Sequence, residues 1–231
     1  MEFNKEDIIW VIIVLFLIIV VATTDVKQNH YGEYSKLSEA ELENLVAKKI
    51  VIQDGVDIKY QQEIVNQVML LKTISDESLY EFLENNIEID LVSYSSILGS
   101  EYAGSFSLSN LPEDMTDIES IEEGGGRAAL SMLTELASST TTYQIIIDYR
   151  YIDYALLHEI GHYFYKVNNL ENNDELNNLI EQVGAEVIKT ELDNSEYFTS
   201  YSEFYAEVFK MYFQGTLKNE QLLGYFDEEF K

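Results

Sequence analysis

The chain has 231 residues, no cysteine and a formal net charge of −28, with 42 Asp and Glu against 14 Lys and Arg. So acidic a surface repels polyphosphate, which argues against nucleic acid as a partner, and the lack of cysteine excludes disulfides, thiolate metal sites and cysteine nucleophiles. The length allows one domain with a sizeable core, and nothing in the sequence indicates an oligomeric state.

The N-terminus carries a long apolar segment. After a short stub at residues 1–7, Ile8 to Ala22 is an unbroken apolar run, and two threonines extend it without charge to residue 24. Residues 8–24 would span about 25 Å as a helix, slightly less than a typical bilayer core. This predicts a transmembrane anchor or the apolar core of a signal peptide, followed by a polar linker at 25–37.

The next part of the chain mixes helix and strand signals. Ser38 followed by Glu41 is a capping-box pattern that predicts a helix over 39–48. Short β-branched or alternating runs predict strands at 50–52, 87–91, 105–109 and 145–147. Helical spacing predicts helices around 64–71 and 79–83, the second capped by Ser75, and the glycines at 124–126 predict a loop.

The remainder of the chain has helical spacing. The predicted helices cover residues 156–167, 176–187, 201–214 and a short segment capped by Asn219. Strands mixed with helices therefore come first and helices alone follow. This order predicts an α+β domain over 38–231, with a small mixed sheet packed on a helical half.

The most informative stretch is His158-Glu159-Ile160-Gly161-His162. On a helix this pattern places two imidazoles one turn apart on one face, where both can bind one zinc ion. Glu159 lies about 100° around the helix from His158, so it can flank the metal and act as the base for an attacking water. Gly161 would let another segment approach closely.

A catalytic zinc usually has three protein ligands, and the third must here be a carboxylate. Glu203 and Glu207 are the best candidates, because they lie at i and i+4 on a largely apolar helix. Burying two such carboxylates is costly unless cations meet them. A zinc ion at Glu203 and an imidazole N–H at Glu207 would satisfy both. Alternatively both carboxylates reach solvent and Glu207 pairs with Lys210.

The motif at 158–162, followed about forty residues later by Glu-Phe-Tyr-Ala-Glu-Val-Phe at 203–209, resembles a known family. It is similar to the zinc endopeptidases related to the catalytic domain of anthrax lethal factor and to the secreted bacterial Pro-Pro endopeptidases. The match covers the helical half, whereas residues 49–94 fit only in outline. A membrane anchor would be a departure from this mostly secreted family.

The resemblance implies a zincin-like fold with one Zn²⁺ per chain, Glu203 as third ligand and Glu207 as its partner outside the coordination sphere. It also implies an upstream tyrosine that donates a hydrogen bond to the transition state. Tyr197 is the nearest match and Tyr201 is the alternative.

The sequence thus predicts a zinc endopeptidase that hydrolyses a protein or peptide substrate, bound extended along an edge strand. It would be attached to a membrane by its N-terminal segment with the catalytic domain outside the cell, or secreted if that segment is cleaved. Two alternatives are a catalytically silent, membrane-tethered zinc-binding interaction protein and an intracellular regulatory protease with the same His-Glu-x-x-His motif.

Overall fold

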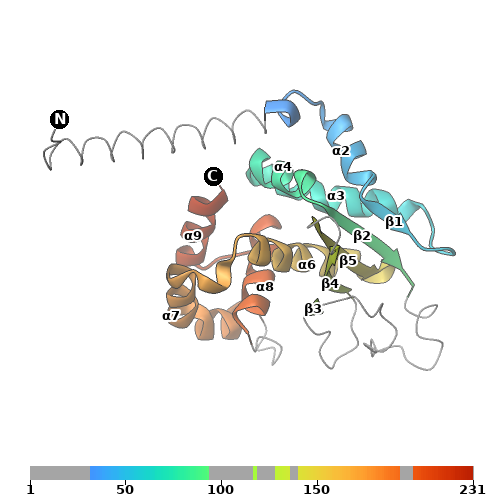
Figure 1. Cartoon of the computed structure of the whole chain (residues 1–231). Coiled ribbons are helices and arrows are strands. Elements are labelled where there is room, and N and C mark those ends of the chain that lie inside the picture. Colours follow the sequence, from blue (N-terminus) through green and yellow to red (C-terminus); the bar gives the residue numbers. More distant parts are fainter. Residues whose placement is uncertain (1–31, 94–116, 119–127, 136–139, 193–199, 231) are drawn as a thin grey trace, which may run out of the picture. The chain divides into compact units, whose positions relative to one another are not determined.

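A computed structural model describes residues 32–93, 117–118, 128–135, 140–192 and 200–230 (Figure 1). The following predictions lie outside these ranges: the stub 1–7, the apolar segment 8–24, residues 25–31 of the linker, the edge strand 105–109, the loop at 124–126 and Tyr197. Within the described ranges, no helix combines the length and the apolar character that crossing a bilayer requires.

The chain divides into two compact units, residues 1–42 and 43–231. Helix α2 (Glu39–Ala47) begins in the first unit with the predicted capping box. The backbone N–H of Ser38 donates to Oε2 of Glu41 at 2.8 Å, and the N–H of Glu41 donates back to the Ser38 hydroxyl at 3.4 Å. The reciprocal bonds explain why the helix begins at this point.

The described part of the second unit contains a five-stranded sheet in the order β1–β2–β5–β4–β3. Its strands are β1 (Ile50–Ile52), β2 (Ile87–Val92), β3 (Asp117–Ile118), β4 (Ala128–Glu135) and β5 (Thr140–Asp148). Strands β1, β2 and β5 are parallel, whereas β4 is antiparallel to both β5 and β3. The predicted strands at 50–52, 87–91 and 145–147 are confirmed, but β4 was not predicted.

Strand β2 has one strongly apolar face. In β2, Ile87, Ile89 and Leu91 are buried while Glu88 and Asp90 are half-buried, as the alternating sequence predicts. Helix α3 (Lys59–Ile74) packs against α4 (Asp76–Glu84) and against α6 (Ile152–Val167). The Ser75 hydroxyl caps α4 by accepting from the N–H of Glu77 at 3.2 Å.

The helical half follows β5. It consists of the 3₁₀ turn η2 (Tyr149–Tyr151), α6 (Ile152–Val167), η3 (Leu170–Asn172), α7 (Asp174–Thr190), α8 (Tyr201–Phe213) and α9 (Glu220–Phe230). Helix α6 packs against both α8 and the strands β4 and β5 (Figure 1). Asn219 caps α9 as predicted, accepting from the N–H groups of Gln221 and Leu222. The predicted combination of a small mixed sheet with a helical half is therefore confirmed.

Candidate metal centre

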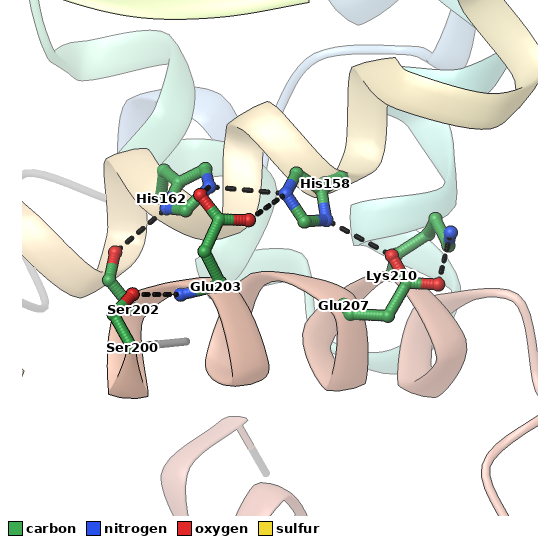
Figure 2. Close-up of polar contacts among 7 residues, drawn as sticks. All are labelled: His158, His162, Ser200, Ser202, Glu203, Glu207 and Lys210. Carbon is green, nitrogen blue, oxygen red and sulfur yellow. Dashed lines mark hydrogen bonds and ion pairs between the residues drawn. The ribbon is translucent and has the colours of Figure 1, made fainter. Parts of the chain in front are cut away.

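Helix α6 presents the two motif histidines on one face. It is continuous through His158 and His162, so these residues lie one turn apart. Their Nε2 atoms are 3.1 Å apart and the ring planes meet at 81° (Figure 2). Both imidazoles therefore point their Nε2 atoms toward one small volume beside the helix.

Helix α8 brings Glu203 to the same volume. Its Oε2 lies 3.2 Å from Nε2 of His158 and its Oε1 lies 3.3 Å from Nε2 of His162 (Figure 2). One ligand atom from each of the three side chains lies within 4.8 Å of the others. The structure thus brings together the three side chains that the sequence singled out as ligands.

The close approach of α6 and α8 depends on Gly161. A Cβ atom at this position would lie 2.7 Å from Cα of Ala206 and 3.0 Å from its carbonyl oxygen. Both are backbone atoms, which cannot move aside as a side chain can. The sequence-based expectation of a close approach at Gly161 is confirmed, and the approaching segment is the helix that carries Glu203.

The Nδ1 atoms of both imidazoles have protein partners. His158 Nδ1 lies 3.0 Å from Oε2 of Glu207, and His162 Nδ1 lies 2.8 Å from the hydroxyl of Ser202 (Figure 2). With these nitrogens protonated, each Nε2 carries a lone pair that faces Glu203. Partners of this kind fix the tautomer and orientation of metal-binding histidines.

Two serines at the start of α8 were not predicted. Ser200 is the N-cap, and its hydroxyl accepts from the backbone N–H of Glu203 at 3.2 Å. The Ser200–Glu203 spacing is that of a capping box, which could have been recognised in the sequence. The Glu203 side chain instead contacts the two imidazoles. The role of Ser202 depends on how the helices cross, and no local sequence signal indicates it.

Glu207 has one contact from each of the two alternatives that the sequence left open. One carboxylate oxygen faces His158, and the other forms an ion pair with Nζ of Lys210 (Figure 2). The Glu207 side chain is 17 % exposed, so the alternative in which it reaches solvent is wrong. Glu203 retains more exposure, at 35 % of its side chain, and borders solvent.

The electrostatics of the cluster favour ionised carboxylates. Burial lowers the pKa of His158, but hydrogen bonds to Glu203 and Glu207 outweigh it and raise the pKa to about 9. Burial raises the pKa of both carboxyls, yet the imidazoles, and for Glu207 also Lys210, hold each pKa below its ordinary value. A cation entering between the imidazoles would meet negative charge already in place.

The donor set and its spacing fit a tetrahedral zinc ion. Zinc bonds of about 2.0–2.2 Å in a tetrahedron separate the ligand atoms by roughly 3.3–3.6 Å. The contacts between Glu203 and the two Nε2 atoms are 3.2 and 3.3 Å, and the Nε2 atoms are 3.1 Å apart. Small outward movements would therefore suffice. Two imidazoles and one carboxylate match a known catalytic zinc donor set, in which water takes the fourth position.

The remaining predicted residues have different surroundings. Glu159 is on α6, next to His158, and only 8 % exposed. The Tyr201 hydroxyl donates to Glu181 of α7 at 3.0 Å, so it is engaged outside the cluster. Tyr197 lies outside the described residues, and its predicted catalytic role stays a prediction.

Comparisons with protein-family models, with curated proteins and with solved structures found no match to this chain.

Proposed function

We propose that the protein is a zinc-dependent endopeptidase. The observation that carries the proposal is the convergence of His158, His162 and Glu203: both Nδ1 atoms have a protein partner, and both Nε2 atoms face one point beside the carboxylate. Such a preorganised set of two imidazoles and a carboxylate is the chemistry of hydrolytic zinc sites.

The order of elements supports assignment to the zincin class. The motif helix α6 follows a strand of a small mixed sheet, and the third ligand comes from a later helix that crosses α6. Together with the resemblance to the lethal-factor-related endopeptidases, this arrangement favours a zincin-like domain. In that class, Glu203 would be the third ligand and Glu207 would orient His158.

Each residue of the site would have its own role in the hydrolysis of a peptide bond. Zn²⁺, when bound, lowers the pKa of a coordinated water and polarises a carbonyl. Glu159 would accept the proton of the attacking water and deliver it to the nitrogen of the leaving amine, because it flanks the ligand face of α6. Tyr197 or Tyr201 would donate a hydrogen bond to the oxygen of the attacked carbonyl.

The proposed substrate is an extended segment of a protein or peptide. Strand β4 lies on the antiparallel side of β5 and contacts α6, so this side of the sheet runs close to the metal helix. On its other side, β4 pairs with β3 through Ser131 and Met132. An extended substrate that continues the sheet on this side would pair main chain to main chain. We further propose that residues 8–24 attach the enzyme to a membrane, or direct its secretion if they are cleaved.

The test is a peptide-library cleavage profile of the full chain, with and without a chelator, beside elemental analysis for zinc. We expect one zinc per chain and cleavage that stops on chelation. Glu159→Gln should keep the zinc and lose hydrolysis by at least about a hundredfold, because it removes the general base. The matched control is Glu186→Gln, an exposed carboxylate on α7.

Each outcome decides between functions. Zinc binding without cleavage of any peptide would support the silent interaction protein instead. Full hydrolysis by Glu159→Gln would refute the role given to Glu159, and a protein that binds no transition metal would remove the proposal altogether.

A further inference from the structure

Lys210 has an unusual position for a lysine. It lies on α8 and is 7 % exposed, and it is the one buried Lys or Arg in the described part of the chain. Burial disfavours an ammonium group strongly unless an opposite charge meets it. Such a side chain therefore needs a specific partner.

The partner is the carboxylate that orients His158. Nζ of Lys210 forms an ion pair with Oε1 of Glu207, while Oε2 of the same carboxylate lies 3.0 Å from His158 Nδ1 (Figure 2). The two oxygens thus have different partners, one cationic and one on the metal side. Rotation of the carboxylate would break both contacts at once.

Lys210 also contacts the motif helix α6. Its Nζ lies 4.7 Å from the ring centroid of Tyr154, in a cation–π arrangement. Tyr154 is one turn before His158 on α6. His158, Glu207, Lys210 and Tyr154 therefore form a closed circuit of contacts between α6 and α8.

The charge of the cluster also requires a cation besides the metal. Glu159, Glu203 and Glu207 together carry three negative charges when ionised, whereas a zinc ion supplies two positive charges. Lys210 would supply the third when all three carboxylates are ionised and the metal is bound. A lysine on the surface would balance this negative charge less effectively, because water screens its charge.

We propose that Lys210 is a positioning residue of the metal centre: by holding Oε1 of Glu207, it fixes the carboxylate so that Oε2 accepts the Nδ1 proton of His158 and the Nε2 lone pair faces the metal. This inference rests on the zinc site of the proposed function, but it does not require peptidase activity. Lys210 acts through Glu207 and contacts no ligand atom that binds the metal.

The test is a double-mutant cycle read as the zinc dissociation constant of the full chain, measured by competition with a chelating dye. Lys210→Met keeps the length of the side chain and removes the charge, and should weaken zinc binding about tenfold. Lys210→Arg should restore the affinity to within about threefold, because it keeps the cation. In the Glu207→Gln background, Lys210→Met should change the affinity less than about threefold, since the residue it acts through is already altered.

Lys49→Met is the matched control. Lys49 is partly buried and donates to the carbonyl oxygen of Asn85 beside the sheet at 2.7 Å. Its loss should leave zinc affinity unchanged. Cobalt substituted for zinc should give the same tetrahedral absorption bands in wild type and in Lys210→Met at saturation, because the ligands are the same.

The outcomes separate the two proposals. Wild-type affinity in Lys210→Met, or equal losses in both backgrounds, would overturn the positioning role. Coupling between the two residues in a protein that cleaves no peptide would support the positioning role while the peptidase proposal fails. A wild-type chain that binds no zinc would overturn both.

Discussion

The two sides of the α6–α8 pair differ in how they hold the helices together. The aromatic side consists of Phe164 and Tyr165 of α6, Tyr205 and Phe209 of α8, and Phe226 and Phe230 of α9, in a set of mutual ring contacts. The polar side consists of His158, His162, Ser202, Glu203, Glu207 and Lys210. Gly161 and Ala206 lie where the helices touch.

The difference separates stability from chemistry. Ring packing is not strongly directional and scales with the buried area, so the aromatic side can stabilise the helix pair whatever is bound nearby. The polar side depends on atom-to-atom partners, because a buried charged group without one is costly. Substitutions on the aromatic side should therefore lower the free energy of unfolding, and those on the polar side should lower the affinity for the metal.

The largest expected effect is that of Phe226→Ala on the aromatic side. Phe226 is 1 % exposed and stacks on Tyr205 and Phe230. Its truncation should lower the free energy of unfolding by about 3–5 kcal/mol in a urea titration, through lost burial and a cavity. The zinc affinity of the folded protein should change less than about twofold. Gln221→Ala, exposed on the same helix, should be neutral within about 0.5 kcal/mol. A tenfold weaker zinc affinity in Phe226→Ala would contradict the separation.

The second prediction concerns the boundary between the two sides. Gly161→Ala places a Cβ within 2.7 Å of the Ala206 backbone, so α6 and α8 must separate. The free energy of unfolding should fall by about 2–3 kcal/mol, as for other overpacked sites. Zinc should also bind more weakly, because its ligands come from both helices.

Gly224→Ala on α9 is the control for this change. A Cβ at Gly224 would have no heavy atom within 4 Å outside its own helix backbone. The substitution should stabilise the helix by about 0.5–1 kcal/mol through propensity alone and leave zinc binding unchanged. Equal effects of the two glycine substitutions would show that helix propensity, and not the close approach, governs Gly161.

The third prediction is that two serines at the start of α8 have different roles, one in zinc binding and the other in stability. Ser202→Ala removes the oxygen 2.8 Å from His162 Nδ1 and should weaken zinc binding about tenfold. Ser200→Ala removes only the cap on the Glu203 N–H and should lower the free energy of unfolding by about 1 kcal/mol. Paired urea and zinc titrations check both. Interchanged results would mean that Glu203 is held by the cap and that the Ser202 contact carries no energy.

Much of the site could be predicted from the sequence because its ligands lie on two regular helices. The spacing of His158 and His162 places both on one face of α6 without knowledge of the sheet. Glu203 followed from the need for a third ligand in a chain without cysteine and from the family resemblance. Both partners of Glu207 were predicted, but as alternatives. That one carboxylate contacts both, and that Ser202 contacts His162, depends on the angle and depth at which α8 crosses α6. Tyr201 was an alternative catalytic residue through the family resemblance, but its hydroxyl bonds to Glu181, which belongs to a different helix.

The fold was predictable where local preference and tertiary structure agree. The run Ile145–Ile147 is β-branched and lies in β5 between two neighbouring strands. Strand β4, Ala128–Glu135, contains Ala, Leu, Met and Glu, which favour helices. It is a strand because it pairs with β5 along its whole length. No local pattern reveals such a pairing when tertiary contacts override propensity.

The smallest expected effect comes from Asp90, a half-buried carboxylate of β2 for which the described residues supply no cationic partner. Burial and the nearby Glu88 raise the pKa of Asp90 from 3.8 to about 6, against a hydrogen bond from Gln144. The folded state thus binds this proton more tightly, so stability from Asp90 is complete below 3.8 and is lost as pH rises through about 6. Asp90→Asn removes the charge and keeps an oxygen that accepts from Gln144. At pH 7 it should raise the free energy of unfolding by about 1 kcal/mol, after allowance for solvent screening. At about pH 3.5 the free energy of unfolding should not change. Urea titrations at both pH values measure this. A loss of stability at pH 7 would mean that the Asp90 charge has a cationic partner, as Glu207 has.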